Sequence, residues 1–175
     1  MAEVAAFDGL FWLSAARYAG GTGLDAPSFA ALLKAHAQAE SAFNPFAYRA
    51  EPGGRASRGI MQILDTTARA LGYTGTLGDD VKHMGGLYDP AISIPLAAQL
   101  IRQNLQEANG SINVAIAAYN EGITRAKDDA ATGRAWRTTD PLYVTKVRAA
   151  LAGFLPYFEG QTDLSRASLS LRGLV

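Results

Sequence analysis

Glu40 is the residue of this sequence whose surroundings best suit acid–base chemistry. On a helix over residues 27–40, its carboxyl group shares one face with the side chains at positions 29, 32, 33 and 36, which are Phe, Leu, Leu and His. It also falls in the last turn, where the negative end of the helix dipole disfavours a carboxylate. Both effects raise its pKa, and a carboxyl group that is protonated near neutral pH suits general acid catalysis. The alternative is a helix-end glutamate that turns out to water.

Other titratable residues are weaker candidates. Glu51 lies in the turn-rich segment 44–59, where a solvated loop charge is favoured over a water-activating role. Asp65 is placed to cap a helix. His36, one turn before Glu40, is interpreted as a core histidine. A solvated loop, and no metal site, is expected where a glycine-rich segment carries Asp79, Asp80 and His83.

Composition excludes several classes of protein. Hydrophobic residues make up 49% of the 175 residues and charged residues 18%, a balance that a disordered chain does not have. The 16 basic and 16 acidic residues cancel, which argues against binding nucleic acid or a membrane surface through excess positive charge. No apolar run approaches the length of a membrane span. There is no cysteine, so disulfides, thiolate zinc sites and cysteine nucleophiles are excluded, and no cofactor is expected.

Hydrophobic periodicity predicts a mainly α fold in one domain, residues 1–160, followed by a loose tail over 161–175. The segment 44–59 should be a loop with a small hairpin, and residues 73–90 should be irregular. Pro95 is expected in a first turn, and Asp65, Ser111 and Asp140-Pro141 at helix starts. The expected helices cover residues 3–18, 27–40, 65–71, 94–108, 112–119 and about 141–154.

Three short motifs follow one another in the chain. Glu40-Ser41 comes first, Gly59-Ile60-Met61-Gln62 second, and Ala118-Tyr119-Asn120-Glu121-Gly122 third. In this order they resemble the lysozyme-like lytic transglycosylases of the soluble-lytic-transglycosylase (SLT) family. Smaller similarities, such as Leu87-Tyr88-Asp89-Pro90 and Tyr143-Val144, extend the resemblance over roughly residues 28–152.

The resemblance implies a lysozyme-like fold and an enzyme that acts on peptidoglycan glycan strands. The bond cleaved would be the β-1,4 link from N-acetylmuramic acid to N-acetylglucosamine, and the product would be a 1,6-anhydro sugar. Glu40 would act first as acid and then as base. Most glycosidases use two carboxylates, but no second one appears in the family motifs.

The resemblance also implies supporting roles for six residues. Met61 and Gln62 would line the cleft, although a core methionine and a backbone-satisfied amide are the alternatives. Tyr119 would contact and orient Glu40, and Tyr143 has a similar but less specific role. The substrate-binding set is Ser41, Met61, Gln62, Tyr119, Asn120 and Tyr143.

Departures from the family pattern bear on the details of the glycan subsites more than on catalysis, and two rival functions stay open beside the transglycosylase. The loop before Gly59 is long, Arg49 stands where serine is frequent, and Glu121 replaces a small residue. One rival is a hydrolase on the same fold, a muramidase or chitinase, which would need Glu51 or Asp65 near the sugar. The other is an inactive virion structural protein. A DNA-binding helical bundle is a more distant alternative.

Charge and the N-terminus bear on how the protein reaches the cell wall. The N-terminal segment lacks the basic region of a secretory leader, which favours a phage endolysin or virion enzyme over a bacterial enzyme whose leader is missing. A neutral chain suits delivery by a virion or partner, or a locally basic cleft. Arg49, Arg55 and Arg58 are the expected source of that local charge. We expect a monomer.

Overall fold

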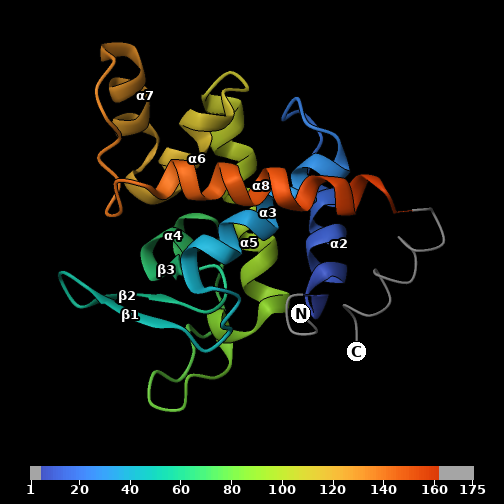
Figure 1. Cartoon of the computed structure of the whole chain (residues 1–175). Coiled ribbons are helices and arrows are strands. Elements are labelled where there is room, and N and C mark those ends of the chain that lie inside the picture. Colours follow the sequence, from blue (N-terminus) through green and yellow to red (C-terminus); the bar gives the residue numbers. More distant parts are fainter. Residues whose placement is uncertain (1–4, 162–175) are drawn as a thin grey trace.

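The computed structural model describes residues 5–161, and in this part the protein is mainly α, as predicted. Seven α-helices and a three-stranded sheet make up the regular structure (Figure 1). The helices are α2 (Asp8–Tyr18), α3 (Ala26–Ser41), α4 (Asp65–Ala70), α5 (Pro90–Glu107), α6 (Ile112–Glu121), α7 (Ile123–Thr132) and α8 (Tyr143–Glu159). The strands are β1 (Tyr48–Glu51), β2 (Arg55–Arg58) and β3 (Ile63–Leu64), and η1 (Gly86–Tyr88) is a 3-10 helix.

Helix α3 forms the centre of the core. It begins at the N-cap Asp25, whose side chain accepts a hydrogen bond from the Ser28 backbone N–H at 2.9 Å, and Pro27 occupies the first turn. Every residue from Phe29 to Ala37 is buried, because α2, α5 and α8 pack around the helix. The helix ends at Ala42, a left-handed residue with φ 52°. The last turn, which carries Glu40, is thereby held against the rest of the core.

The predicted hairpin is present and lies beside the helices (Figure 1). Strands β1 and β2 pair antiparallel, with Arg49 opposite Ser57 and Glu51 opposite Arg55. Strand β3, which periodicity did not predict, pairs with β2 as the third strand. Two residues are too few for an alternation pattern to appear in the sequence.

Arg58 fastens the hairpin to the segment after α4. Its Nε and Nη2 atoms donate to the two carboxylate oxygens of Asp80 at 2.6 and 2.7 Å, and the Tyr88 hydroxyl donates to the same carboxylate. The His83 ring stacks between those of Tyr48 and Tyr88. The segment 73–90, predicted to be irregular, is therefore ordered by an ion pair and an aromatic stack. Within residues 5–161, no three His, Asp or Glu side chains are grouped to hold a metal ion.

Several element boundaries differ from those predicted. Helix α5 starts at Pro90, capped by Asp89, so Pro95 lies inside it. Asp65 lies in the first turn of α4 and is not its N-cap; its carboxylate accepts from the Ala56 N–H across the sheet. Ser111 is the N-cap residue of α6, but its side chain makes no capping hydrogen bond.

Two further differences concern the C-terminal part. Helix α7 was not predicted, because it is largely exposed and buries only Ala126 and Asp129. Helix α8 begins two residues after Pro141 and continues to Glu159. The predicted tail, apart from Gln161, falls outside the described residues.

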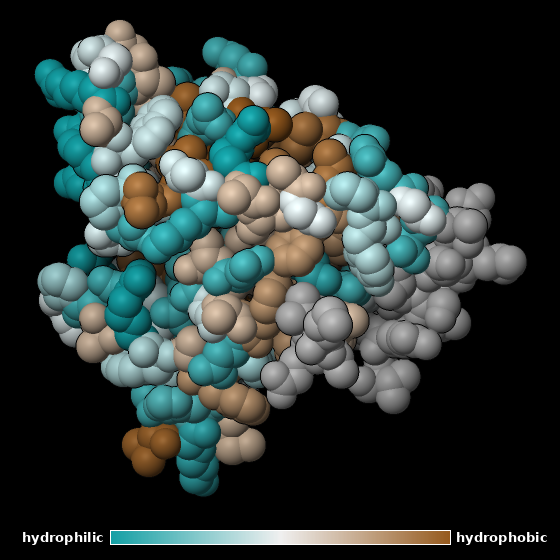
Figure 2. Space-filling view, in the orientation of Figure 1, coloured by the Kyte–Doolittle hydropathy of each residue, from teal (hydrophilic) through white to brown (hydrophobic). Residues whose placement is uncertain are grey.

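Polar and apolar side chains are interspersed over the face shown in Figure 2. Among residues 5–161, the exposed large hydrophobic residues are Phe46, Tyr48, Val81, Met84, Leu142 and Tyr157. Within the described chain, none of the helices combines the length and the apolar character that a membrane crossing requires.

Candidate active site

A cleft of about 470 Å³ runs between the hairpin and the helices. Glu40 from the end of α3 lies in its wall, with Arg49 and Glu51 contributed by β1. Helices α5 and α6 supply further lining residues, among them Asn104 and Tyr119. Segments far apart in the sequence thus meet around one carboxyl group.

The pKa of Glu40 is raised to about 7, and burial is the main cause. The Tyr143 hydroxyl donates a hydrogen bond to Glu40 Oε1 at 2.5 Å, which favours the carboxylate and opposes the rise. Arg49 also lowers the pKa, and the like charge of Glu51 raises it. A carboxyl group with a pKa of about 7 can both give and take a proton near neutral pH.

His36 lies behind this contact as a buried core residue, as interpreted from the sequence. Its Nδ1 atom is 3.0 Å from the Tyr143 hydroxyl, and burial lowers its pKa to about 3. When the Tyr143 hydroxyl donates its hydrogen bond to the Glu40 carboxylate, the neutral imidazole of His36 donates from Nδ1 to the hydroxyl oxygen. The side chains of His36, Tyr143 and Glu40 are thus linked in that order by two hydrogen bonds.

Within the described chain Tyr119 donates no hydrogen bond to Glu40, although burial and then the charge of Glu40 raise the pKa of Tyr119. Its hydroxyl donates to the backbone carbonyl of Met61 at 2.7 Å, and its ring lies 4.6 Å from that of His36. The hydrogen bond to Glu40 comes instead from Tyr143, on α8. The Met61 side chain is fully buried in the core and does not line the cleft.

The Gly59–Gln62 segment is a tight turn whose residues are required by its geometry. Gly59 has φ 74°, and a Cβ at this position would stand 2.0 Å from the Leu87 carbonyl oxygen. Gln62 also has positive φ, and its amide donates to the carbonyls of Ala47 and Gly59. Ser41 donates to the Ile60 carbonyl at 2.7 Å, tying the end of α3 to this turn. Gln62 still faces the cleft.

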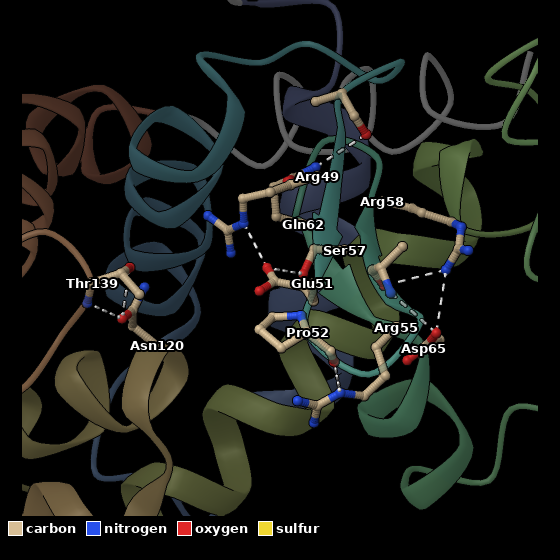
Figure 3. Close-up of polar contacts among 12 residues, drawn as sticks. Arg49, Glu51, Pro52, Arg55, Ser57, Arg58, Gln62, Asp65, Asn120 and Thr139 are labelled. Atoms are coloured by element: carbon tan, nitrogen blue, oxygen red, sulfur yellow. Dashed lines mark hydrogen bonds and ion pairs between the residues drawn. The ribbon is translucent and has the colours of Figure 1, made fainter.

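Arg49 and Glu51 form an ion pair on the hairpin side of the cleft (Figure 3). Arg49 Nε donates to Glu51 Oε1 at 2.6 Å, and the Ser57 hydroxyl donates to the same oxygen at 3.2 Å. Glu51 is therefore a paired group that faces the cleft, and not a solvated loop charge. Asp65 does not line the cleft.

Of the three arginines expected to make the cleft locally basic, only Arg49 lines it. Arg55 donates to the Pro52 carbonyl (Figure 3). Arg58 is buried and donates to Asp80. Asn120, which also lines the cleft, accepts hydrogen bonds from the backbone and side chain of Thr139. With Glu51 and Glu107 also present, the cleft walls are not strongly basic.

The sequence interpretation missed the face that α5 presents to the cleft. This face consists of Leu100, Gln103, Asn104 and Glu107. Their spacing of three and four residues places them together on a helix. That pattern was visible, but it is also typical of an ordinary exposed helix edge, and nothing in the sequence showed which side met the cleft.

Comparisons with known proteins agree with this architecture. The family model described as the transglycosylase SLT domain matches residues 27–138. A protein of Enterobacteria phage PRD1 named "Transglycosylase" is 34% identical over 95 residues, which make up 54% of this chain and 30% of that protein. The matched segment therefore spans less than a third of the phage protein's length. No solved structure gives a significant match. The family match takes in most of the described chain, including Glu40, Gln62 and Tyr119, and so the chain belongs to the transglycosylase SLT domain family.

Proposed function

We propose that the protein is a peptidoglycan lytic transglycosylase with Glu40 as its catalytic residue. It cleaves the β-1,4 bond from N-acetylmuramic acid to N-acetylglucosamine without water. The observation that carries the proposal is the position of Glu40: a buried carboxyl group with a pKa of about 7, at the wall of a cleft, in a chain of the SLT family.

One carboxyl group is sufficient for both proton transfers. Protonated Glu40 gives its proton to the glycosidic oxygen, and the bond from that oxygen to C1 of the muramic acid breaks. The 6-hydroxyl of the same sugar then bonds to C1 and returns its proton to the Glu40 carboxylate. The 1,6-anhydro ring closes and the acid is regenerated, with no co-reactant consumed.

The surrounding residues support this cycle. Tyr143 stabilises the carboxylate form between the two transfers by its hydrogen bond to Oε1. Arg49 adds a positive charge across the cleft. Gln62 and Asn120 are proposed to bind sugar hydroxyl or acetamido groups. Ser41 instead holds the Ile60 carbonyl, and Met61 packs in the core while its carbonyl accepts from Tyr119.

Mass spectrometry of digested peptidoglycan tests the proposal. We expect muropeptides that end in 1,6-anhydro-muramic acid, and a loss of at least about 100-fold in rate for Glu40→Gln, which keeps the shape but has no acidic proton. Glu107→Gln, at an exposed position of the same cleft, is the control. Full activity of Glu40→Gln would exclude Glu40 as the acid.

A hydrolase is the second candidate, because Glu51 faces the cleft. A muramidase would need this carboxylate to activate water, and its products would carry a reducing muramic acid. Glu51 is already engaged by Arg49 and Ser57, which favours the transglycosylase. The same mass spectra decide between the two products, and an inactive virion protein would give neither.

Delivery to the wall by a phage particle is our proposal for the protein's context. The similarity to a phage PRD1 protein supports it, as does the absence of excess positive charge. The partner is then the glycan strand, reached from the periplasmic side, and we expect the chain to act as a monomer.

A further inference from the structure

One buried polar group in the cleft has no role in the mechanism above. Asn104, on α5, is only 4% exposed, and its Nδ2 atom is buried without a hydrogen-bond partner within the described chain. An unpaired buried amide donor destabilises a folded protein, so its presence here requires an explanation.

The place of Asn104 suggests what the missing partner is. The residue lines the cleft that holds Glu40, and the lining of that cleft also includes the apolar side chains of Ile63, Leu64, Leu100 and Ile123. A ligand group that suits such surroundings has a carbonyl oxygen to accept from Nδ2, an N–H to offer the Asn104 oxygen, and a small apolar end. An acetamido group has all three.

We propose that Asn104 binds the acetamido group of an N-acetylated sugar and makes the α5 side of the cleft selective for acetylated glycan. The proposal deepens the function proposed above and rests on a glycan being the substrate. A de-N-acetylated unit presents an ammonium group, which has no carbonyl to accept from Nδ2. It would leave the donor unpaired, so such strands should be poorer ligands.

Binding measured without catalysis tests the proposal separately from the reaction. The Glu40→Gln protein is titrated in a calorimeter with the N-acetylglucosamine tetramer and, separately, with the fully de-N-acetylated tetramer. The two affinities are then compared. We expect the acetylated tetramer to bind at least about tenfold more tightly. Adding Asn104→Leu should remove most of that difference, and Gln106→Ala, an exposed residue of the same helix that does not line the cleft, should leave it unchanged.

Thermal unfolding supplies a second readout that a purely structural asparagine would not give. Leu is similar in size to Asn and needs no hydrogen bond, so Asn104→Leu should raise the Tm by about 2–4 °C while weakening binding. A fall in Tm would show that the amide serves the fold, and would overturn the proposal.

The remaining outcomes are also decisive. Equal affinity for the two tetramers, or no measurable binding of either, would refute the role of Asn104. If the unsubstituted protein still formed anhydro-muropeptides, the transglycosylase proposal would hold and only the role of Asn104 would be refuted. Conversely, selective binding without any cleavage by the unsubstituted chain would support the acetamido site and refute the catalytic proposal.

Discussion

The neighbours of Glu40 shift its pKa in opposite directions, and each shift can be measured. Burial and the charge of Glu51 favour the acid, whereas the Tyr143 hydroxyl and Arg49 favour the carboxylate. A group that must donate and then accept a proton works best when neither form is strongly preferred. Substitutions around it should therefore move the pH profile in predictable directions.

Tyr143→Phe removes the hydrogen bond that stabilises the Glu40 carboxylate, so the pKa of Glu40 should rise. In the proposed mechanism the acid form of Glu40 starts the reaction. The alkaline limb of the pH–rate profile should therefore move to higher pH, with a lower maximal rate. Tyr119→Phe is the matched control, since that hydroxyl bonds to the Met61 carbonyl and should leave the limb in place. Identical profiles for the two variants would contradict the assignment.

Glu51→Gln should have the opposite effect. It removes a like charge that raises the pKa of Glu40 and releases Arg49, which lowers it. The alkaline limb should therefore move to lower pH, as measured by the rate of peptidoglycan clearing between pH 5 and 9. The products should remain anhydro-muropeptides, and a switch in product type would assign Glu51 a direct chemical role.

The central helix α3 is fixed to its neighbours by a buried ion pair. Lys34 Nζ contacts Asp8 on α2 at 2.5 Å, and both side chains are almost fully buried. The same ammonium group lies over the rings of Phe154, Tyr157 and Phe158 on α8, at 5.0 to 5.8 Å. The Lys34 ammonium group thus links α2, α3 and α8, less than two helical turns before Glu40.

Lys34→Met should destabilise the fold strongly, because it leaves the Asp8 carboxyl group buried without its cation. We expect a loss of about 3–5 kcal/mol in the free energy of unfolding, measured by urea denaturation. Lys127→Met, on the exposed side of α7, should change it by less than about 0.5 kcal/mol. Adding Asp8→Asn to Lys34→Met should recover part of the loss.

The sequence predicted the elements that have their own local signals. Pro27 marks the first turn of α3, its apolar stripe marks the buried face, and glycines mark the hairpin. It could not predict α7, which buries little, or the two-residue strand β3. Nor could it show that Tyr143 rather than Tyr119 reaches Glu40, because that depends on how α8 packs against α3.

At the scale of the whole molecule, the raised pKa of Glu40 is a cost to stability. The unfolded chain ionises this group near pH 4.5, whereas the folded protein holds the proton until about pH 7. Stability therefore falls as pH rises between these values, by up to about 3 kcal/mol in total, and the loss is complete above pH 7.

Glu40→Gln should remove this cost. We expect the variant to be more stable than the unsubstituted protein at pH 8, by up to about 3 kcal/mol, and equally stable at pH 4. Urea denaturation at the two pH values measures the difference. A gain of the same size at both would mean that packing, and not ionisation, is responsible.

The distance along the chain between Glu40 and Tyr143 has a consequence for biosynthesis. The family match ends at residue 138, so a fragment cut to that boundary would keep every matched motif and lose the hydroxyl that bonds to the acid. In the same way, a growing chain on the ribosome carries Glu40 early but cannot complete the site until α8 has been made and has docked on α3. The nascent protein should therefore not cleave glycan until α8 has left the ribosome and packed against α3.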